Sequence, residues 1–143
     1  MKETKHRSAC AIAFGLDIVG DKWSLIIVRD IALRGKVSYG DFLKSEEKIA
    51  TNILASRLVS LETNGIISKK NDSSDKRKEY YSLTKKGIDL LPVLLEMLIW
   101  GAKYFSKNES PKWFVNQAKK DKKILIRQIK SGVKSGKYLL KRD

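Results

Sequence analysis

The segment from Asn52 to Asn64 carries leucines four and three residues apart, and a glycine follows it at once. This spacing is typical of an amphipathic α-helix, and glycine is the favoured residue directly after a helix. The next runs, Ile66 to Lys70 and Glu79 to Leu83, have the composition of strands and flank the polar loop Asn71 to Lys78. A helix that leads directly into a two-stranded hairpin is the feature that most limits the fold.

Shorter helices are predicted before this unit. Apolar residues at helical spacing indicate a helix from Ala11 to Val19, and Asp21 is placed to cap a second helix from Lys22 to about Leu33. After a turn, we expect Val37 to Tyr39 to be extended and Gly40 to Ser45 to form a brief helix.

A long apolar helix is predicted after the hairpin, from a cap at Thr84 to about Tyr104, with a bend at Pro92. It carries more apolar residues than one packed face needs, so we expect it to contact both its own core and a second subunit. Trp113 to about Lys130 follows as an amphipathic helix with a frayed basic end beyond Gly132. The residues assigned to the subunit interface are Leu91, Leu95, Leu98 and Ile99.

Together these elements predict a mainly α-helical fold with a small β-hairpin wing, which is the winged helix-turn-helix architecture. We expect residues 1–8 to be a flexible leader and residues 9–105 to form the winged domain, including its long dimerisation helix. Residues 106–143 are expected to form a basic C-terminal helix and tail.

The net charge of +14 favours a polyanionic partner, nucleic acid first and an anionic membrane surface second. No apolar run approaches the roughly 20 residues that span a bilayer, and Asp17 interrupts the one stretch that resembles a signal peptide. The single cysteine, Cys10, cannot form an internal disulfide. We therefore expect a cytoplasmic protein that binds no membrane.

The predicted helix from Asn52 to Asn64 would present a weakly charged edge if its leucines face the core. Asn52, Ser56, Val59 and Thr63 lie on that edge. Asparagine can bond adenine bidentately, serine can donate or accept, and an apolar group can meet a thymine methyl. We expect Arg57 to contact a phosphate or to tie the helix into the fold. The residues assigned to DNA contact on this helix are Thr51, Asn52, Ser56, Arg57 and Ser60.

The predicted hairpin supplies positive charge beside this helix. Basic groups clustered in this way can neutralise phosphates and release counterions. The alternative is a solvated charged loop, just as ordinary exposed surface is the alternative for Asn52 and Ser56. The residues assigned to the DNA-binding wing are Lys69, Lys70, Lys76, Arg77 and Lys78.

No catalytic motif accompanies these elements. His6 is the single histidine, and the sequence has no glycine-rich phosphate loop, metal-ligand spacing or nucleophile motif. We expect no enzyme activity, no metal site and no cofactor.

Short matches over about two thirds of the chain resemble the HxlR-type family of winged helix-turn-helix regulators. They begin at Cys10 and end with the pair Trp100-Gly101. Between these lie Leu16 to Trp23, Leu25 to Asp30, Gly35, Tyr39 to Phe42, Ile49 to Asn52, Arg57-Leu58, Leu61-Glu62, Gly65-Ile66, Tyr81 to Thr84 and Gly87.

The resemblance implies a bacterial transcription regulator that binds double-stranded DNA as a homodimer. The terminal helices would form the dimer, and two wings would flank two recognition helices on a pseudo-palindromic operator. Many relatives have a capping serine where this chain has Ala50, so we expect Thr51 to cap the helix instead. The wing of many relatives contains proline, which Asn71 to Lys78 lacks.

Some relatives use a cysteine at the position of Cys10 to sense oxidants or electrophiles. A thiol at a helix N-terminus, near Arg7 and Lys5, is in a setting that favours reactivity. A lone cysteine beside two alanines is also typical of a small buried apolar residue. Both interpretations stay open from the sequence.

Two other binding functions remain open. A nucleoid- or RNA-binding protein with little sequence preference would suit the tail, where residues 106–143 carry a net charge of +9. Against it, the aromatic residues do not form a stacking platform for single strands. A protein-interaction adaptor could use the winged fold without DNA, but the basic wing argues against that.

Overall fold

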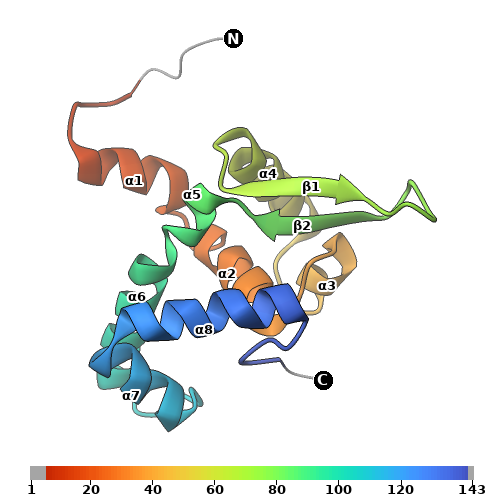
Figure 1. The fold of residues 1–143 in the computed structure, drawn as a ribbon. Helices are drawn as coiled ribbons and strands as arrows, with labels where there is room; N and C mark the ends of the chain where they lie inside the picture. The colour runs from red at the N-terminus through yellow and green to blue at the C-terminus, as the bar shows by residue number, and fades with distance from the viewer. Residues whose placement is uncertain (1–5, 142–143) are drawn as a thin grey trace.

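The computed structural model describes residues 6–141, and residues 1–5 of the expected leader lie outside the described part. The described chain is a helical body with one antiparallel hairpin that projects from it (Figure 1), which confirms the predicted fold class. The elements are α1 (Ala11–Val19), α2 (Ser24–Arg29), the π-helical segment η1 (Asp30–Arg34), α3 (Tyr39–Leu43), α4 (Thr51–Thr63), β1 (Ile67–Asn71), β2 (Glu79–Leu83), α5 (Lys85–Ile88), α6 (Leu91–Tyr104), α7 (Lys112–Lys120) and α8 (Lys122–Ser135).

Asp21 holds the turn that leads into α2, but the helix begins at Ser24 with Trp23 at its N-cap, not at Lys22 with Asp21 as the cap, as predicted. One carboxylate oxygen of Asp21 accepts the backbone N–H groups of Trp23 and Ser24, each at 2.9 Å. The helix continues without interruption into η1, which ends at Arg34 with Gly35 as its C-cap. Gly35 has a φ of +68°, a left-handed conformation in which a side chain would be strained.

The helix–hairpin unit also agrees with the prediction. The three leucines of α4 are buried, and β1 pairs antiparallel with β2 so that Ile67 lies opposite Leu83. Tyr81 is buried and Tyr80 is exposed on the other face. The extended segment before α3 joins the hairpin, because the carbonyl of Val37 accepts the N–H of Tyr81 at 2.8 Å.

The predicted single helix after the hairpin is two helices, α5 and α6. Thr84 does cap the first, since its hydroxyl oxygen accepts the N–H of Gly87 at 3.1 Å. Pro92 lies in the first turn of α6, where the missing N–H costs no helical hydrogen bond. The proline therefore starts a second helix rather than bending one long helix.

The predicted single C-terminal helix is likewise divided, because the extended backbone of Asp121 separates α7 from α8. Its carboxylate accepts the N–H of Ile124 at 3.2 Å and so caps α8. The prediction of a frayed end beyond Gly132 is wrong. The helix runs to Ser135, and the N–H of Leu140 then donates to the carbonyl of Leu33 at 2.9 Å.

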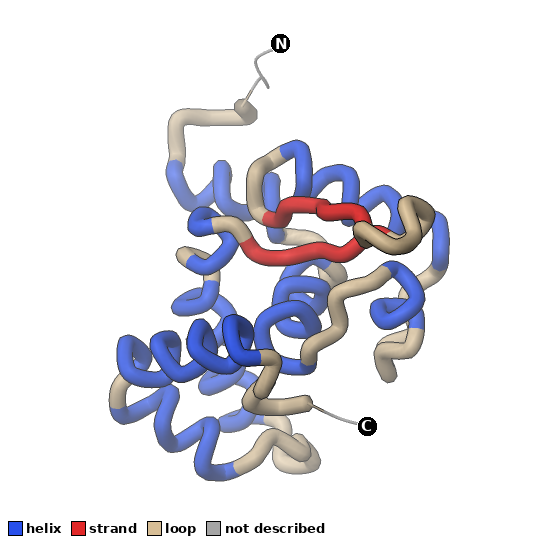
Figure 2. Tube along the Cα trace, turned by 45° about the vertical axis from the view of Figure 1, so that its right-hand side comes forward, coloured by secondary structure: helices blue, strands red, loops and turns tan. Residues whose placement is uncertain are grey.

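A single hydrophobic core joins the winged part to the C-terminal helices. Leu125 and Ile129 of α8 and Phe114 of α7 belong to the same buried cluster as Ile31 and Leu95. Figure 2 shows α6, α7 and α8 together at one end of the molecule, with the hairpin at the other. The expected basic tail is thus a packed part of the fold. No helix in residues 6–141 is long and apolar enough to span a membrane.

Candidate nucleic-acid interface

The polar edge predicted on α4 is open to solvent. Asn52, Ser56, Val59 and Thr63 are all exposed, with Val59 at 64%. The leucines on the opposite side are at most 3% exposed, so packing in the core fixes which edge faces outward. This edge offers amide, hydroxyl and apolar groups, which are the groups that read base edges in a major groove.

The predicted cap at the start of α4 is wrong. Thr51 is the first helical residue, and Ala50 holds the extended backbone position before it, with φ −69° and ψ 145°. Only a side chain at that position could accept the next N–H groups, and alanine has no acceptor. The helix thus begins without a side-chain cap, and such an N-terminus favours an anion such as a phosphate.

Arg57 ties α4 to the start of α2. One of its guanidinium nitrogens lies 3.7 Å from a carboxylate oxygen of Asp21, and another donates to the hydroxyl of Ser56 at 3.3 Å. Burial raises the pKa of Asp21, but hydrogen bonds from Ser24 and Trp23 and the charge of Arg57 outweigh it and lower the pKa. Ser60 and Arg57 are half-buried, whereas the other helix residues predicted to contact DNA, Thr51, Asn52 and Ser56, are exposed.

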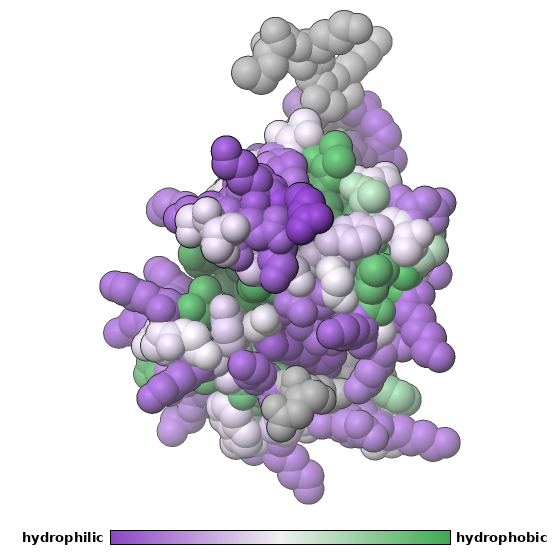
Figure 3. Space-filling view, turned by 90° about the vertical axis from the view of Figure 1, so that its right-hand side faces the viewer, coloured by the Kyte–Doolittle hydropathy of each residue, from purple (hydrophilic) through white to green (hydrophobic). Residues whose placement is uncertain are grey.

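The wing presents its basic side chains to solvent at the tip of the hairpin. Lys70, Lys76, Arg77 and Lys78 are exposed. The hairpin projects from the body in Figure 1, and the surface at its tip is hydrophilic in Figure 3. Lys69 lies farther from the tip, with its ammonium group 3.6 Å from the carboxylate of Glu79. The five predicted basic residues are thus gathered on one hairpin.

Two aspartates give the wing loop a defined shape that sequence reasoning missed. A carboxylate oxygen of Asp72 accepts the N–H and hydroxyl of Ser74 at 2.9 and 2.8 Å, and Asp75 accepts the N–H of Arg77 at 3.0 Å. These hydrogen bonds lower the pKa of both aspartates. The sequence did hold a signal for these turns, because an aspartate side chain often accepts the backbone N–H two residues after it in a turn.

The predicted subunit interface needs a correction on α6. Leu91 and Leu95 are each 1% exposed within one chain, so they pack in the chain's own core and are not available to a partner. Leu98 and Ile99 are half-buried. The outward stripe of α6 consists of residues that the sequence analysis did not select. They are Val93, Met97, Trp100 and Tyr104.

Helix α1 lies on the same side of the molecule as α6, away from the hairpin tip (Figure 1). None of its residues is buried, and even its apolar side chains are open to solvent, with Ile12 75% and Leu16 57% exposed. We call α1 together with the outward stripe of α6 the apolar face. Apolar side chains gathered in this way mark an interaction surface.

Cys10 lies at the N-cap of α1 and is exposed. The interpretation of Cys10 as a buried apolar residue is therefore wrong. Its backbone N–H donates to the hydroxyl of Ser8 at 3.2 Å. In the part of the chain that the structure describes, no group of three or more histidine, cysteine, aspartate or glutamate residues is placed to hold a metal.

Comparison with known proteins agrees with this geometry. Residues 18–109 match the family described as HxlR-like helix-turn-helix. The HTH-type transcriptional regulator YdeP of Bacillus subtilis is 37% identical over 95 residues, which is 66% of this chain and 73% of YdeP. The crystal structure of PA1607 has a TM-score of 0.65 and 37% identity, over 73% of this chain and 72% of PA1607. The redox regulator HypR in its oxidized form has a TM-score of 0.59 and 29% identity, over 66% of this chain and 96% of HypR.

Proposed function

Because this chain belongs to the HxlR-like helix-turn-helix family of transcriptional regulators, we propose that it binds a specific double-stranded operator as a homodimer. The observation that carries the proposal is the open polar edge of α4 beside a basic hairpin. The edge reads bases, the wing holds the backbone, and the uncapped start of α4 favours a phosphate.

The apolar face supports the proposed dimerisation. A helix of nine residues with no buried side chain, such as α1, gains its stability from packing against something else. A second copy that covers α1 and α6 would supply this, and a two-fold pair would present two α4 helices to a pseudo-palindromic site.

A single substitution tests the dimer. Trp100→Glu places a charge on the apolar face, where Trp100 is 68% exposed and its ring centroid lies 5.3 Å from that of Tyr104. We expect the solution mass to fall to that of a monomer and operator affinity to fall with it. Ile124→Glu, on the exposed side of α8, is the control and should remain dimeric. A dimeric Trp100→Glu protein would contradict this interface.

DNA specificity is tested by fluorescence anisotropy against duplexes from the gene's own upstream region, with random duplex as competitor and salt varied. A specific regulator of this kind prefers its site by a factor of about 10³ or more. Equal affinity for every duplex would favour the nucleoid-binding alternative instead, and no duplex binding would favour the adaptor.

Cys10 supports a second element of the proposal, a response to oxidants. Its thiol is exposed at the end of the apolar face, and HypR is a redox regulator. Since the sequence holds one cysteine, a disulfide would have to join Cys10 of two subunits. Diamide should change operator affinity in the wild type and leave a Cys10→Ser protein unaffected. A Cys10→Ser protein that still responds to diamide would rule the thiol out.

A further inference from the structure

The outer side of α8 carries a row of basic residues. They recur at intervals of four, three and four residues, so they lie above one another on one side of the helix, over a length of about 16 Å. All of them are exposed, whereas Leu125 and Ile129 on the opposite side are buried in the core. We call them the basic stripe, and its members are Lys123, Arg127, Lys130 and Lys134.

The basic stripe has no acidic residues to balance its charge. No aspartate or glutamate occurs between Lys122 and Lys141. Lys122 pairs with Glu96 at 2.6 Å, but the four stripe residues form no ion pair within the described part of the chain. Like charges three or four residues apart repel each other, and a helix face that is only solvated usually carries both signs. The stripe therefore has the charge pattern of a surface that binds an anionic partner.

Hydrogen-bonding groups lie beside the stripe in an open groove of about 440 Å³. The chain turns back after α8 at Gly136, which has a φ of +74°, and the returning tail lies against the helix. A Cβ at Gly132 would lie only 2.7 Å from the carbonyl oxygen of Lys137. The polar residues that line the groove are Arg127, Gln128, Ser131, Ser135 and Lys137.

The composition of this groove favours a phosphate backbone over a protein partner. Amide, hydroxyl and cationic side chains are the groups that contact phosphate oxygens in DNA complexes. Protein interfaces are instead enriched in aromatic residues and depleted in lysine, and the described residues that line the groove include no aromatic side chain.

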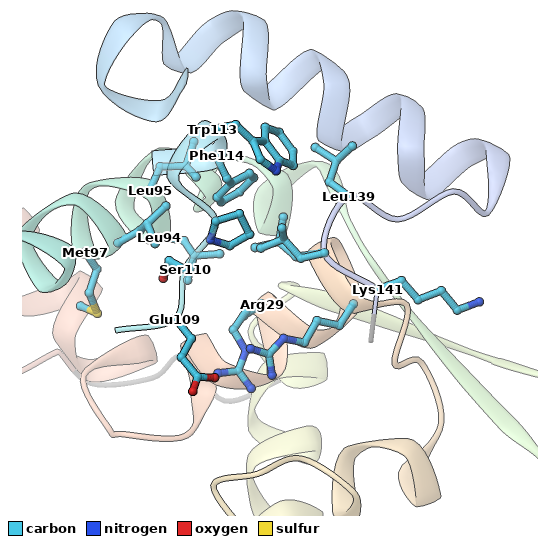
Figure 4. A pocket seen from close by; sticks show the side chains of 15 residues that line it. Arg29, Leu94, Leu95, Met97, Glu109, Ser110, Trp113, Phe114, Leu139 and Lys141 are labelled. Carbon is cyan, nitrogen blue, oxygen red and sulfur yellow. The ribbon is translucent and has the colours of Figure 1, made fainter. Parts of the chain in front are cut away.

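The C-terminal packing holds α8 in a fixed orientation. Figure 4 shows Leu95 of α6, Phe114 of α7 and Leu139 of the tail gathered around one cavity. Leu125 of α8 is fully buried in the core that these elements share. The stripe therefore needs little ordering when it binds, which lowers the entropic cost of association.

The stripe and the polar edge of α4 lie on different sides of the molecule. Figure 1 shows α8 across the front of the body and α4 behind the hairpin. Both helices bury leucines in the same core, so their outward sides face away from each other. Duplex DNA is stiff over about 150 base pairs, and a straight duplex on α4 would not reach the stripe.

We propose that the basic stripe binds the phosphate backbone of a second DNA duplex, so that a dimer on its operator holds two segments of DNA together. A stripe of this length faces about five base pairs, and its contacts are independent of sequence. That the first segment is an operator rests on the proposed function, whereas the binding of duplex by the stripe does not.

A capture assay tests the second contact. Short operator duplex is fixed to beads, saturated with full-length protein and washed, and a labelled random duplex is then added. The random duplex should be retained with a Kd of about 10⁻⁴–10⁻⁶ M. Four phosphate contacts should give a slope of about −3.6 for log K against log salt. No retention in this range, at low salt, would overturn the proposal.

Matched double variants locate the contact. Arg127→Gln with Lys130→Gln removes two charges from the stripe, and Lys107→Gln with Lys112→Gln removes two exposed charges elsewhere in the C-terminal segment. The stripe variant should bind the captured duplex at least about tenfold more weakly and lower the salt slope by about two. Operator affinity should stay unchanged in both variants.

An equal loss of capture in the two double variants would show that net charge, not the stripe, binds the second duplex. Full capture by the stripe variant would also overturn the proposal. Lys130→Gln with Lys134→Gln repeats the test if the first pair does not fold, and circular dichroism checks folding in each protein.

Two further arms separate the alternatives. Poly-glutamate that releases the captured duplex as well as unlabelled DNA does, at equal charge, would overturn the DNA assignment in favour of an acidic protein surface. If the stripe variant loses affinity for a long operator but the wild type captures no second duplex, flanking DNA bends onto α8 and the second duplex is wrong. Random duplex on the beads tests the stripe even if the protein shows no operator preference. Capture there by the wild type but not by the stripe variant would keep this inference while the proposed function fails.

Discussion

Asn52 lies in the first turn of α4 with its amide open to solvent, where it can donate and accept at one base edge. We predict that Asn52→Ala lowers the preference for the operator over a duplex changed at one base pair by about 1–3 kcal/mol. Affinity for random duplex should hardly change. Competition anisotropy across single-base variants of the operator measures this. An equal loss on all duplexes would mean that Asn52 contacts the backbone rather than a base.

Arg77 is expected to act differently, because its 92% exposed side chain lies at the wing tip and contacts only Asp75 within the described chain. Arg77→Ala should weaken specific and random duplexes alike. It should also reduce the slope of log K against log salt by about one. The control is Arg127→Ala, which removes a basic residue from α8. A similar slope change in the control would show that net charge, not the wing, sets the salt dependence.

Residue-level prediction succeeded where burial alone decides orientation. The leucine spacing of α4 was sufficient to place Asn52 and Ser56 outward. The spacing could not place the start of the helix to within one residue. The helix begins one residue earlier than predicted, so the cap position falls on Ala50 and not on Thr51. The turns at Asp72 and Asp75 were missed because their hydrogen bonds depend on loop geometry rather than on periodicity.

At the scale of elements, an ion pair joins α2 to the turn before α4. The guanidinium of Arg29 donates to both carboxylate oxygens of Glu47 at 2.8 Å. These hydrogen bonds lower the pKa of Glu47 from an ordinary 4.5 to about 2, against a smaller effect of burial that raises it. The pair therefore stabilises the fold above about pH 4.5, and this contribution is lost as the pH falls toward 2.

We predict that Glu47→Gln lowers the free energy of unfolding by about 1 kcal/mol at pH 7, a value discounted for partial exposure. The difference from the wild type should shrink as the pH falls from about 4.5 toward 2, because Glu47 is protonated in the unfolded protein first and in the folded protein only near pH 2. Urea unfolding at several pH values measures it, with Glu62→Gln as a control on the exposed side of α4. A difference that stays constant down to pH 3 would mean that the carboxylate charge is not what stabilises the fold.

Elements were predictable as far as local spacing determines them. The hairpin and α4 depend on short-range pattern, and both were predicted closely. The breaks before α6 and at Asp121 were not predicted, because apolar residues continue at helical spacing on both sides of each break. When a helix has apolar residues on more than one face, the spacing also does not predict which face packs in the chain's own core. For α6 the answer depends on α7 and α8, which pack against it, and Leu95 belongs to the core that they share.

At the scale of the whole molecule, the C-terminal helices belong to the same hydrophobic core as the winged part. Leu125 is fully buried, whereas its neighbour Ile124 is 42% exposed on the other side of α8. The two residues offer a matched test, because they have the same number of carbon atoms and occupy adjacent positions on one helix. If the core is shared, a cavity at Leu125 should destabilise the hairpin and α4 as well as α8.

We predict that Leu125→Ala lowers the free energy of unfolding by about 2–5 kcal/mol and Ile124→Ala by less than about 1 kcal/mol. Denaturant unfolding followed both by far-ultraviolet circular dichroism and by amide exchange in α4 should give one coincident transition in each protein. The midpoint should move to lower denaturant in Leu125→Ala with little change in slope. If α8 unfolds first while protection in α4 is unchanged, the extension is a separate unit. In that case α8 would not stabilise the DNA-binding helix, because its packing energy would be confined to the C-terminal segment.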